Sequence, residues 1–262
     1  MQLVRRPRSA LSAGRGEPKL TSVAVYSAKG GVGKSTLAVN LAWSAATHSA
    51  RKTLIWDLDA QGATTFILGQ GKATAVQAQK VFAKDADPDA MIRTTAYERL
   101  DLLPADASLR RLDRLFFDLG KKKRLAKLIQ TIGKRYDRII LDCPPGLTET
   151  SEQILQAADL VLAPVIPSPL SQRALDDVVA FVGRQSGRHP PILPIYSMVD
   201  RRRGLHREAL EQRPDWPVIP MASAIEQMAS ERAPVGTFAP RSAAAEAFAT
   251  LWRGVERRIN KL

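Results

Sequence analysis

The sequence contains a single cysteine, Cys143. One cysteine cannot form an intramolecular disulfide, so a disulfide-stabilised secreted domain is excluded and a reducing compartment is favoured. Long apolar runs are also missing, because no stretch approaches the roughly 18 apolar residues of a membrane span. No secretory apolar segment follows Met1. We therefore expect a cytoplasmic protein with no stable insertion into a membrane.

Acidic residues are scarce relative to basic ones. The chain has 39 Lys and Arg against 26 Asp and Glu, which gives a formal net charge of +13. Such a surface attracts polyanions, nucleic acid first and an anionic membrane second. The composition is otherwise ordinary for a soluble protein, with 45% hydrophobic residues, and 262 residues are enough for one full core.

A glycine-rich loop follows the apolar run 23–27 and precedes a segment of helical character. Strand, glycine-rich loop and helix is the context that a phosphate-binding loop requires. The glycines let backbone N–H groups turn towards a phosphate, and the helix adds its N-terminal dipole. Lys34 is placed to reach the β- and γ-phosphates, and Ser35 to put its hydroxyl on Mg²⁺. The residues predicted to bind nucleotide are Lys29, Gly30, Gly31, Val32, Gly33, Lys34, Ser35 and Thr36.

Apolar runs with the character of strands alternate along the chain with segments of helical spacing. The predicted strands are 22–27, 52–59, 100–104, 137–142, 160–166, 191–199 and 218–219; the predicted helices include 109–119, 121–134, 172–184 and 242–260, with short helices within 72–99. This alternation predicts a mostly parallel, twisted β-sheet with helices on both faces. We predict a single-domain α/β P-loop NTPase over 20–262, preceded by a disordered basic tail at 1–19.

Three aspartates stand at or near the ends of predicted strands: Asp57, Asp59 and Asp142. Nucleotide chemistry needs a divalent ion, and carboxylates hold Mg²⁺ directly or through water. Asp57 and Asp59 would share a face if the strand continued through both, and one of them could then polarise the attacking water. We predict that Ser35, Asp57 and Asp142 form the Mg²⁺ site, the acids acting through water.

Three motifs together resemble the ParA/MinD family of ATPases, which have a deviant phosphate loop. They are the loop 29–36, the segment 57–62 (Asp-Leu-Asp-Ala-Gln-Gly) and the segment 140–146 (Ile-Leu-Asp-Cys-Pro-Pro-Gly). Ala28 stands where the general loop pattern has its first glycine, and Ala60 replaces a proline of the ParA branch, to which the likeness is greatest. The resemblance implies a weak, partner-stimulated ATPase with ATP and Mg²⁺ as cofactors.

The same resemblance implies a homodimer that forms around two ATP molecules. Lys34 would act in cis, Lys29 would reach the partner subunit's phosphates, and Asp59 would activate the attacking water; these three are the predicted catalytic residues. Gly62 and Gly146 fall in segments similar to the family's two switches. A physical argument supports the role of Lys29, because two cations in one short loop are tolerated only if triphosphate charge is present or one of them points elsewhere.

Positive charge recurs on one side of the last predicted helix, opposite an apolar side. A one-sided cationic stripe suits phosphate contacts that need no base reading. The resemblance implies non-specific binding of double-stranded DNA on the bacterial nucleoid by the ATP dimer, and release when a ParB-like or other cargo adaptor stimulates hydrolysis. The DNA-binding candidates are Arg201, Arg202, Arg203, Arg241, Arg253, Arg257 and Lys261.

Other interpretations stay open at this point. A membrane-associated switch of the MinD type would need an amphipathic helix beyond the fold. A metabolic ligase with a phosphate loop is disfavoured by Lys29. Cys143, beside Asp142, is interpreted as a small buried residue, because the related nitrogenase iron proteins use two cysteines per subunit. Neither the cargo nor a role for the basic segments 1–19 and 110–138 is assigned.

Overall fold

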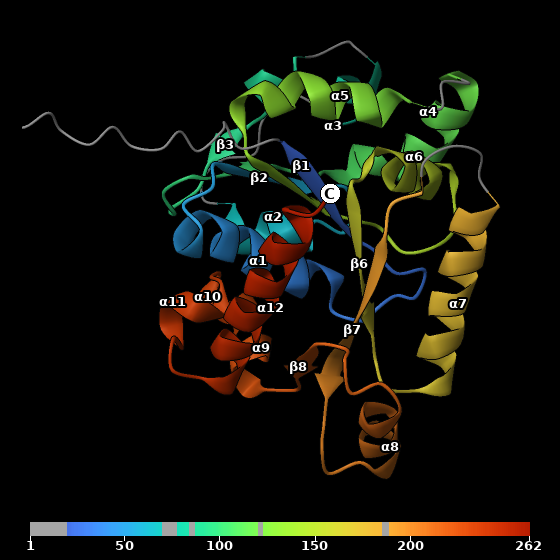
Figure 1. The fold of residues 1–262 in the computed structure, drawn as a ribbon. Coiled ribbons are helices and arrows are strands. Elements are labelled where there is room, and N and C mark those ends of the chain that lie inside the picture. The colour runs from blue at the N-terminus through green and yellow to red at the C-terminus, as the bar shows by residue number, and fades with distance from the viewer. Residues whose placement is uncertain (1–19, 70–77, 84–86, 120–122, 185–188) are drawn as a thin grey trace, which may run out of the picture.

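The computed structural model describes residues 20–69, 78–83, 87–119, 123–184 and 189–262 (Figure 1). The predicted tail at 1–19 lies outside these residues, as do parts of the predicted helical regions 72–99 and 121–134. The described chain forms one eight-stranded sheet with the order β3-β4-β2-β5-β1-β6-β7-β8. Neighbouring strands are parallel except β3, which runs antiparallel to β4. The predicted mostly parallel α/β sheet is confirmed.

The central strands are buried along their whole length, and this explains why they are continuous apolar runs in the sequence. Every residue of β1, β2, β5 and β6 is buried. The strands are β1 (Thr21–Val25), β2 (Thr53–Asp57), β3 (Arg93–Thr94), β4 (Leu100–Leu103), β5 (Arg138–Asp142), β6 (Leu160–Val165), β7 (Ile192–Val199) and β8 (Val218–Pro220).

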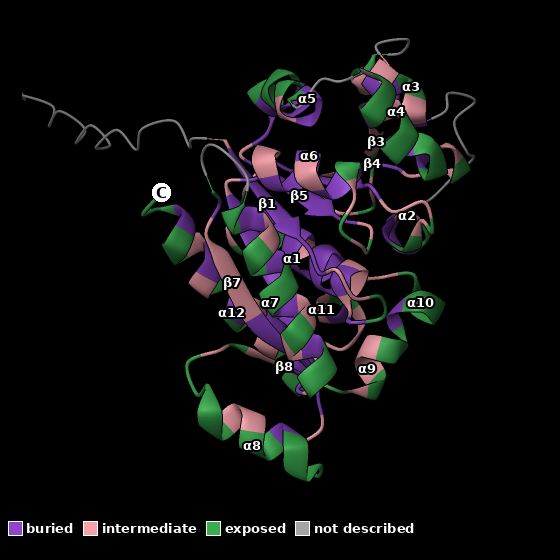
Figure 2. Cartoon of the chain, turned by 90° about the vertical axis from the view of Figure 1, so that its right-hand side faces the viewer, coloured by how far each residue is buried: buried purple, intermediate pink, exposed green. Residues whose placement is uncertain are grey.

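Helices cover both faces of the sheet, and the buried residues lie between the layers (Figure 2). One core joins α1, α2 and α10–α12 to the sheet, and the other joins α3–α7 to the opposite face. Within the described ranges, no helix is long and apolar enough to cross a membrane. The helices are α1 (Lys34–His48), α2 (Ala63–Leu68), α3 (Ala78–Ala83), α4 (Leu112–Leu119), α5 (Arg124–Ile132), α6 (Glu149–Ala157), α7 (Pro169–Gly183), α8 (Gly204–Gln212), α9 (Ser223–Glu226), α10 (Met228–Glu231), α11 (Val235–Phe238) and α12 (Ala243–Ile259).

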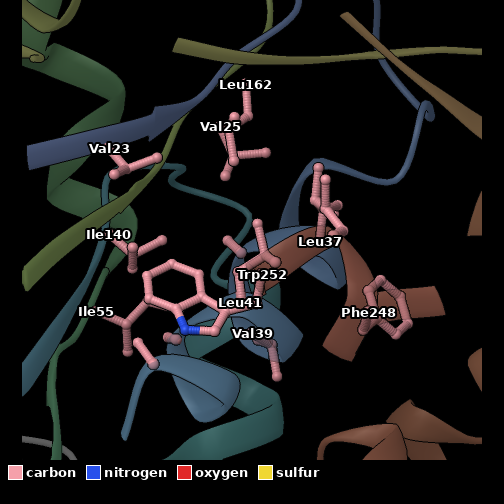
Figure 3. Packing of buried hydrophobic residues seen from close by; sticks show 14 of the residues in the cluster. Val23, Val25, Leu37, Val39, Leu41, Ile55, Ile140, Leu162, Phe248 and Trp252 are labelled. Carbon is pink, nitrogen blue, oxygen red and sulfur yellow. The ribbon is translucent and has the colours of Figure 1, made fainter. Parts of the chain in front are cut away.

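Trp252 of α12 lies at the centre of the first core. Its fully buried indole packs near Leu41, Ile55 and Ile140, which come from α1, β2 and β5 (Figure 3). The indole Nε1 donates a hydrogen bond to Ser49 Oγ, 2.8 Å away, so its polar group is satisfied. The last helix is therefore fixed on the sheet by its apolar side, as its pattern predicts.

The differences from the sequence-based prediction concern short elements. The strand predicted through Asp59 ends at Asp57. The helices α2, α6 and α9–α11 are absent from the prediction, and β3 lies in a region where only short helices are expected. Helix α7 begins earlier than predicted, at Pro169, because Ser168 caps it by accepting a hydrogen bond from Ser171 N. Short helices gain most of their stability from tertiary packing, so their local pattern is weak.

Candidate nucleotide site

The loop between β1 and α1 has the geometry of a phosphate cradle. Gly31 and Gly33 have φ of 70° and 87°, a left-handed conformation that residues with a Cβ rarely adopt. A Cβ on Gly30 or Gly31 would meet no atom within 4 Å, so the loop faces open space. No side chain of the described residues caps the N-terminus of α1 at Gly33. The first N–H groups of the helix are therefore available to an anion.

The two loop lysines lie in different surroundings. Lys34 is buried, and its Nζ donates a hydrogen bond to the Lys29 carbonyl oxygen, 3.1 Å away. Burial lowers the pKa of Lys34, and the negative charge of Asp142 opposes that shift. Lys29 is partly exposed at the start of the loop. Its backbone N–H donates to Ser27 Oγ, 3.3 Å away. The Lys34 ammonium is thus already directed into the loop.

Asp142 ends β5 and is completely buried beside the loop. Its Oδ2 accepts a hydrogen bond from Thr64 Oγ1 at 2.8 Å, and the Ser35 side chain also hydrogen-bonds to it. Its Oδ1 has no hydrogen-bond partner among the described residues. Burial raises the pKa of Asp142 to about 6, although the hydrogen bonds from Ser35 and Thr64 oppose the shift. A buried, unpartnered carboxylate oxygen next to a serine hydroxyl fits a hard divalent cation.

Asp57 ends β2 and is paired in register with Asp142 on β5. Asp57 is fully buried, and its Oδ2 accepts hydrogen bonds from Thr65 N at 2.8 Å and from Thr65 Oγ1 at 2.7 Å. Burial, and then the charge of Asp142, raise the pKa of Asp57 to about 8. Two neighbouring buried carboxyl groups repel each other when both are ionised. A shared proton or a cation such as Mg²⁺ would relieve that repulsion.

Asp59 does not share a strand face with Asp57, because β2 ends before it. It lies in the following loop, partly exposed, and its Oδ1 accepts a hydrogen bond from Gln61 N at 2.9 Å. Its negative charge still raises the pKa of Lys34 and Asp142, which places it close to both groups. The condition for a shared face is therefore not met, because β2 stops at Asp57 and Asp59 belongs to the loop that follows.

The loop after β5 contacts the phosphate loop directly. Gly146 N donates a hydrogen bond to the Ala28 carbonyl oxygen at 3.0 Å, and Gly146 has a φ of 95°. Cys143 in the same loop is fully buried, as expected. Within the described part of the chain, no group of three or more Cys, His, Asp or Glu could hold a metal ion. The fit to Mg²⁺ described above therefore depends on the hydroxyl of Ser35 as well as on the acids.

An apolar pocket opens beside Gly33 and the start of α1. Its walls come from the ends of β7 and β8, from α9 and from α12. Met198, in the wall, has a φ of 55° where the pairing of β7 with β8 is irregular, and such strained non-glycine residues concentrate at functional sites. The lining residues are Gly33, Thr36, Leu37, Ile195, Ser197, Met198, Ile219, Pro220, Met221, Ala222, Ile225, Glu226 and Phe248.

The sequence analysis missed this pocket and the two threonines that hold the acids. Thr64 and Thr65 carry no motif of their own, and only the turn at Gly62 brings them to Asp142 and Asp57. The pocket combines segments far apart in the chain. No local signal could have identified either feature.

The basic candidates for DNA binding are exposed but do not form one cluster. Arg253, Arg257 and Lys261 are exposed on or just after α12, opposite its buried side. The predicted two-sidedness of that helix is confirmed. Arg241 is exposed just before α12, and the others follow β7 in the turn Arg201, Arg202 and Arg203.

Arg202 and Arg203 of that turn share an acid, and the turn lies far from the end of α12. Asp200 accepts hydrogen bonds from Arg202 at 2.9 and 3.0 Å and lies 3.7 Å from Arg203. The turn follows the carboxyl end of β7, whereas the last turns of α12 reach Arg138, at the opposite edge of the sheet. One flat DNA surface on a single subunit would therefore not contain every candidate.

A family model and relatives in sequence indicate the family of this chain. A family model described as an AAA domain (AAA_31) matches residues 20–192. The sporulation initiation inhibitor protein Soj of Bacillus subtilis is 29% identical over 246 residues, which cover 89% of this chain and 97% of Soj. A ParA family protein of Chlamydia pneumoniae is 30% identical over 174 residues, which cover 65% of this chain and 68% of that protein.

Solved structures share the fold. MinD of Pyrococcus horikoshii, complexed with Mg-ADP, superposes with a TM-score of 0.74 at 25% identity, covering 90% of this chain and 96% of MinD. The ATP complex of Cyanothece McdA(D38A) superposes with a TM-score of 0.76 at 20% identity, covering 91% of this chain and 98% of McdA. At that lower identity, the likeness to McdA shows the fold alone.

Proposed function

This chain belongs to the ParA/MinD family of P-loop ATPases, and from that premise we propose that it is a ParA-like ATPase whose ATP-bound dimer holds DNA non-specifically and releases it on hydrolysis. A cargo adaptor, ParB-like or of another kind, would stimulate the hydrolysis on the nucleoid. The observation that carries the proposal is the unpartnered Oδ1 of buried Asp142 beside Ser35 and Lys34.

Different residues of the site would contact the phosphates, the cation and the attacking water. Lys34 neutralises the β- and γ-phosphates, and the N–H groups at Gly33 and Lys34 bind their oxygens. Ser35 and Asp142 would hold Mg²⁺, which would neutralise charge on the phosphates, and Asp57 would act on the ion through water. Asp59, in its partly exposed position, orients the attacking water and accepts its proton.

The apolar pocket beside Gly33 takes the adenine. Its walls of methionine, isoleucine and proline offer the flat, apolar surroundings that a purine ring prefers, and the pocket adjoins the loop that holds the phosphates. The backbone groups and Glu226 at its rim supply the few polar contacts that orient a base. The lining of this pocket supports the proposal for the adenine, for which the motifs offer no signal.

Exposed apolar side chains support the dimer. Most of the large ones in the described chain follow the carboxyl end of a strand, at the edge of the sheet that also carries the phosphate loop. Apolar side chains gathered on one face mark an interaction surface. A second copy that covers this edge brings Lys29 of each subunit towards the other's phosphates. These side chains are Phe66, Leu147, Leu170, Leu205 and Met221.

The role of Lys29 is tested by comparing Lys29→Ala with Lys34→Ala. Lys34→Ala should abolish nucleotide binding, since it removes the cation in cis. Lys29→Ala should still bind ATP but should stay monomeric, because its cation acts across the dimer. Light scattering after gel filtration with a slowly hydrolysed ATP analogue separates these outcomes. A Lys29→Ala protein that dimerises and hydrolyses ATP like wild type would exclude the role in trans.

DNA binding is tested with a double charge reversal on α12, Arg253→Glu with Arg257→Glu. Affinity for arbitrary duplex in ATP should fall strongly, and wild-type affinity should fall as salt is raised. The matched control is Arg114→Glu with Lys127→Glu, which makes the same change in net charge at exposed positions of α4 and α5. Equal losses in both variants would mean that overall charge, and not the α12 stripe, holds the DNA.

A membrane-switch function is less well supported. The apolar side chains of α12 are already packed in the core, so the helix has no free apolar face to insert into a bilayer. Co-sedimentation with anionic liposomes in ATP measures this directly.

A further inference from the structure

Helix α2 is held at its N-terminal end by the acids of the nucleotide site. Gly62, close behind Asp59, is its N-cap, and its first turn supplies Thr64 to Asp142 and Thr65 to Asp57. Any rearrangement of these acids around a cation and a triphosphate therefore acts directly on α2.

The other end of α2 is held by a residue from a distant part of the chain. The Nε of Arg232 donates a hydrogen bond to the Phe66 carbonyl oxygen, 3.0 Å away, and its Nη2 donates to the Gly69 carbonyl oxygen. The guanidinium also lies over the Phe66 ring, 5.0 Å from its centroid. Carbonyl groups in the last turn of a helix have no hydrogen-bond donor within the helix. A cation near them also interacts favourably with the negative end of the helix dipole. Arg232 thus caps α2 and stacks on it.

The backbone of Arg232 is in a conformation that favours glycine. It ends α10 with φ 49° and ψ 49°, the left-handed position where glycine is the usual residue. A residue with a side chain is less favourable there than glycine. Because glycine would be more favourable in this conformation, we infer that the arginine side chain has a structural role. Its contacts with α2 provide that role.

The segment that carries Arg232 also forms a wall of the apolar pocket. Met221 and Ile225 line the pocket just before α10. Asn40 of α1 fastens the same segment on both sides of Arg232: its Nδ2 lies 3.1 Å from Met228 Sδ, and its Oδ1 accepts a hydrogen bond from Val235 N at 2.9 Å. The segment 221–235 therefore connects the pocket wall with the C-terminal end of α2 through one anchored piece of chain.

We propose that Arg232 is a positioning residue that couples the acids at the phosphate end of the site to the apolar pocket at its other end. When Mg²⁺ and a triphosphate order Asp57 and Asp142, α2 is held in place, and Arg232 holds the pocket wall closed with it. ATP then gains affinity that ADP does not. This inference rests on the proposed function, because it assumes that the loop and the pocket hold one nucleotide.

The decisive variant is Arg232→Gly, which keeps the left-handed backbone free of strain and removes the three contacts with α2. The matched control is Arg99→Gly, since Arg99 is another arginine with a positive φ, 64°, whose side chain contacts the Ala50 carbonyl oxygen and the neighbouring Glu98, away from α2. Fluorescent ADP and a slowly hydrolysed fluorescent ATP analogue are titrated with Mg²⁺, and thermal unfolding is recorded without nucleotide.

Arg232→Gly should unfold at a temperature close to that of wild type but lose at least about fivefold in its preference for the ATP analogue over ADP. Arg232→Lys, which keeps the cation over Phe66 and one donor, should recover part of the preference. Arg99→Gly should leave it unchanged. An Arg232→Gly protein with the wild-type ratio of the two affinities, or an equal loss in Arg99→Gly, overturns the coupling. Wild-type protein that binds neither nucleotide would instead overturn the proposed function, and the coupling with it.

Discussion

The hydroxyl of Tyr26, the residue after β1, donates a hydrogen bond to the Gly146 carbonyl oxygen, 2.5 Å away, in the loop after β5. Ser151 Oγ donates to the same oxygen at 2.6 Å, and Gly146 N donates to the Ala28 carbonyl oxygen. Burial raises the pKa of Tyr26 to about 12, so the hydroxyl stays a donor at physiological pH. The loop that follows Asp142 is therefore fastened to the first residues of the phosphate loop.

Tyr26→Phe should loosen this loop without disturbing the core, because phenylalanine fills the same buried space. The Gly146 carbonyl keeps the Ser151 donor, so we expect the free energy of unfolding to fall by about 0.5–1.5 kcal/mol. Amide hydrogen exchange should become faster over 143–148. Ser151→Ala is the companion variant and should act on the same peptide. If exchange there stays at the wild-type rate in both variants, these hydrogen bonds do not hold the loop.

The features that could be predicted are those that neighbouring residues encode. The phosphate loop around Lys34 and the acid Asp142 each lie next to a strand in the sequence, and this local context is enough to recognise them. The buried sides of the long helices follow from spacing, and Trp252 is buried as its position on α12 requires.

The features that could not be predicted depend on contacts between distant segments. Thr65 binds Asp57 because of a turn at Gly62, and Arg232 reaches Phe66 from a part of the chain that carries no periodic pattern. The conditional expectation for Asp59 failed for a related reason: the end of a strand depends on where its neighbours stop pairing, and β2 stops at Asp57.

Glu256→Ala should destabilise the protein strongly. Glu256 of α12 forms a two-bond ion pair with the buried guanidinium of Arg138, at 2.9 and 3.2 Å, and lies 3.5 Å from Arg51. Its removal leaves the buried cation of Arg138 without this carboxylate, and such changes cost about 3 kcal/mol or more. Urea unfolding measures the loss. Arg138→Met with Glu256→Leu removes both charges and should recover most of it, and a Glu256→Ala loss below about 1 kcal/mol would contradict the ion pair's importance.

The contribution of His206 to stability should fall as the pH drops below about 6.5. Asp57 and Asp142, whose pKa values are raised, act in the opposite direction, because the folded protein binds their protons first. The Asp200 N–H donates to His206 Nδ1 at 3.0 Å, so this nitrogen must be unprotonated. Burial, and then the charge of Arg203, lower the pKa of His206, while Asp200 opposes the shift. The unfolded chain therefore binds a proton before the folded protein does, and this favours unfolding at lower pH.

The measurement for this histidine is urea unfolding between about pH 5.5 and pH 7.5. As the pH drops, His206→Gln should lose less stability, or gain more, than wild type does. His48→Gln, at an exposed histidine, serves as the control and should keep the wild-type dependence. Identical slopes for wild type and His206→Gln would exclude His206 as the source.

Two glycine-to-alanine changes should have opposite effects on stability. A Cβ on Gly236 of α11 would lie 2.2 Å from Trp43 Cζ3, so the indole or the helix must move. We expect a loss of about 1–3 kcal/mol from this overpacking. A Cβ on Gly183, in the last turn of α7, meets no atom within 4 Å, and its higher helix propensity should make the change neutral or slightly stabilising. Urea unfolding compares the two. Adding Trp43→Leu to Gly236→Ala opens the space and should recover part of the loss; if it makes the loss larger, the clash with the indole is not its cause.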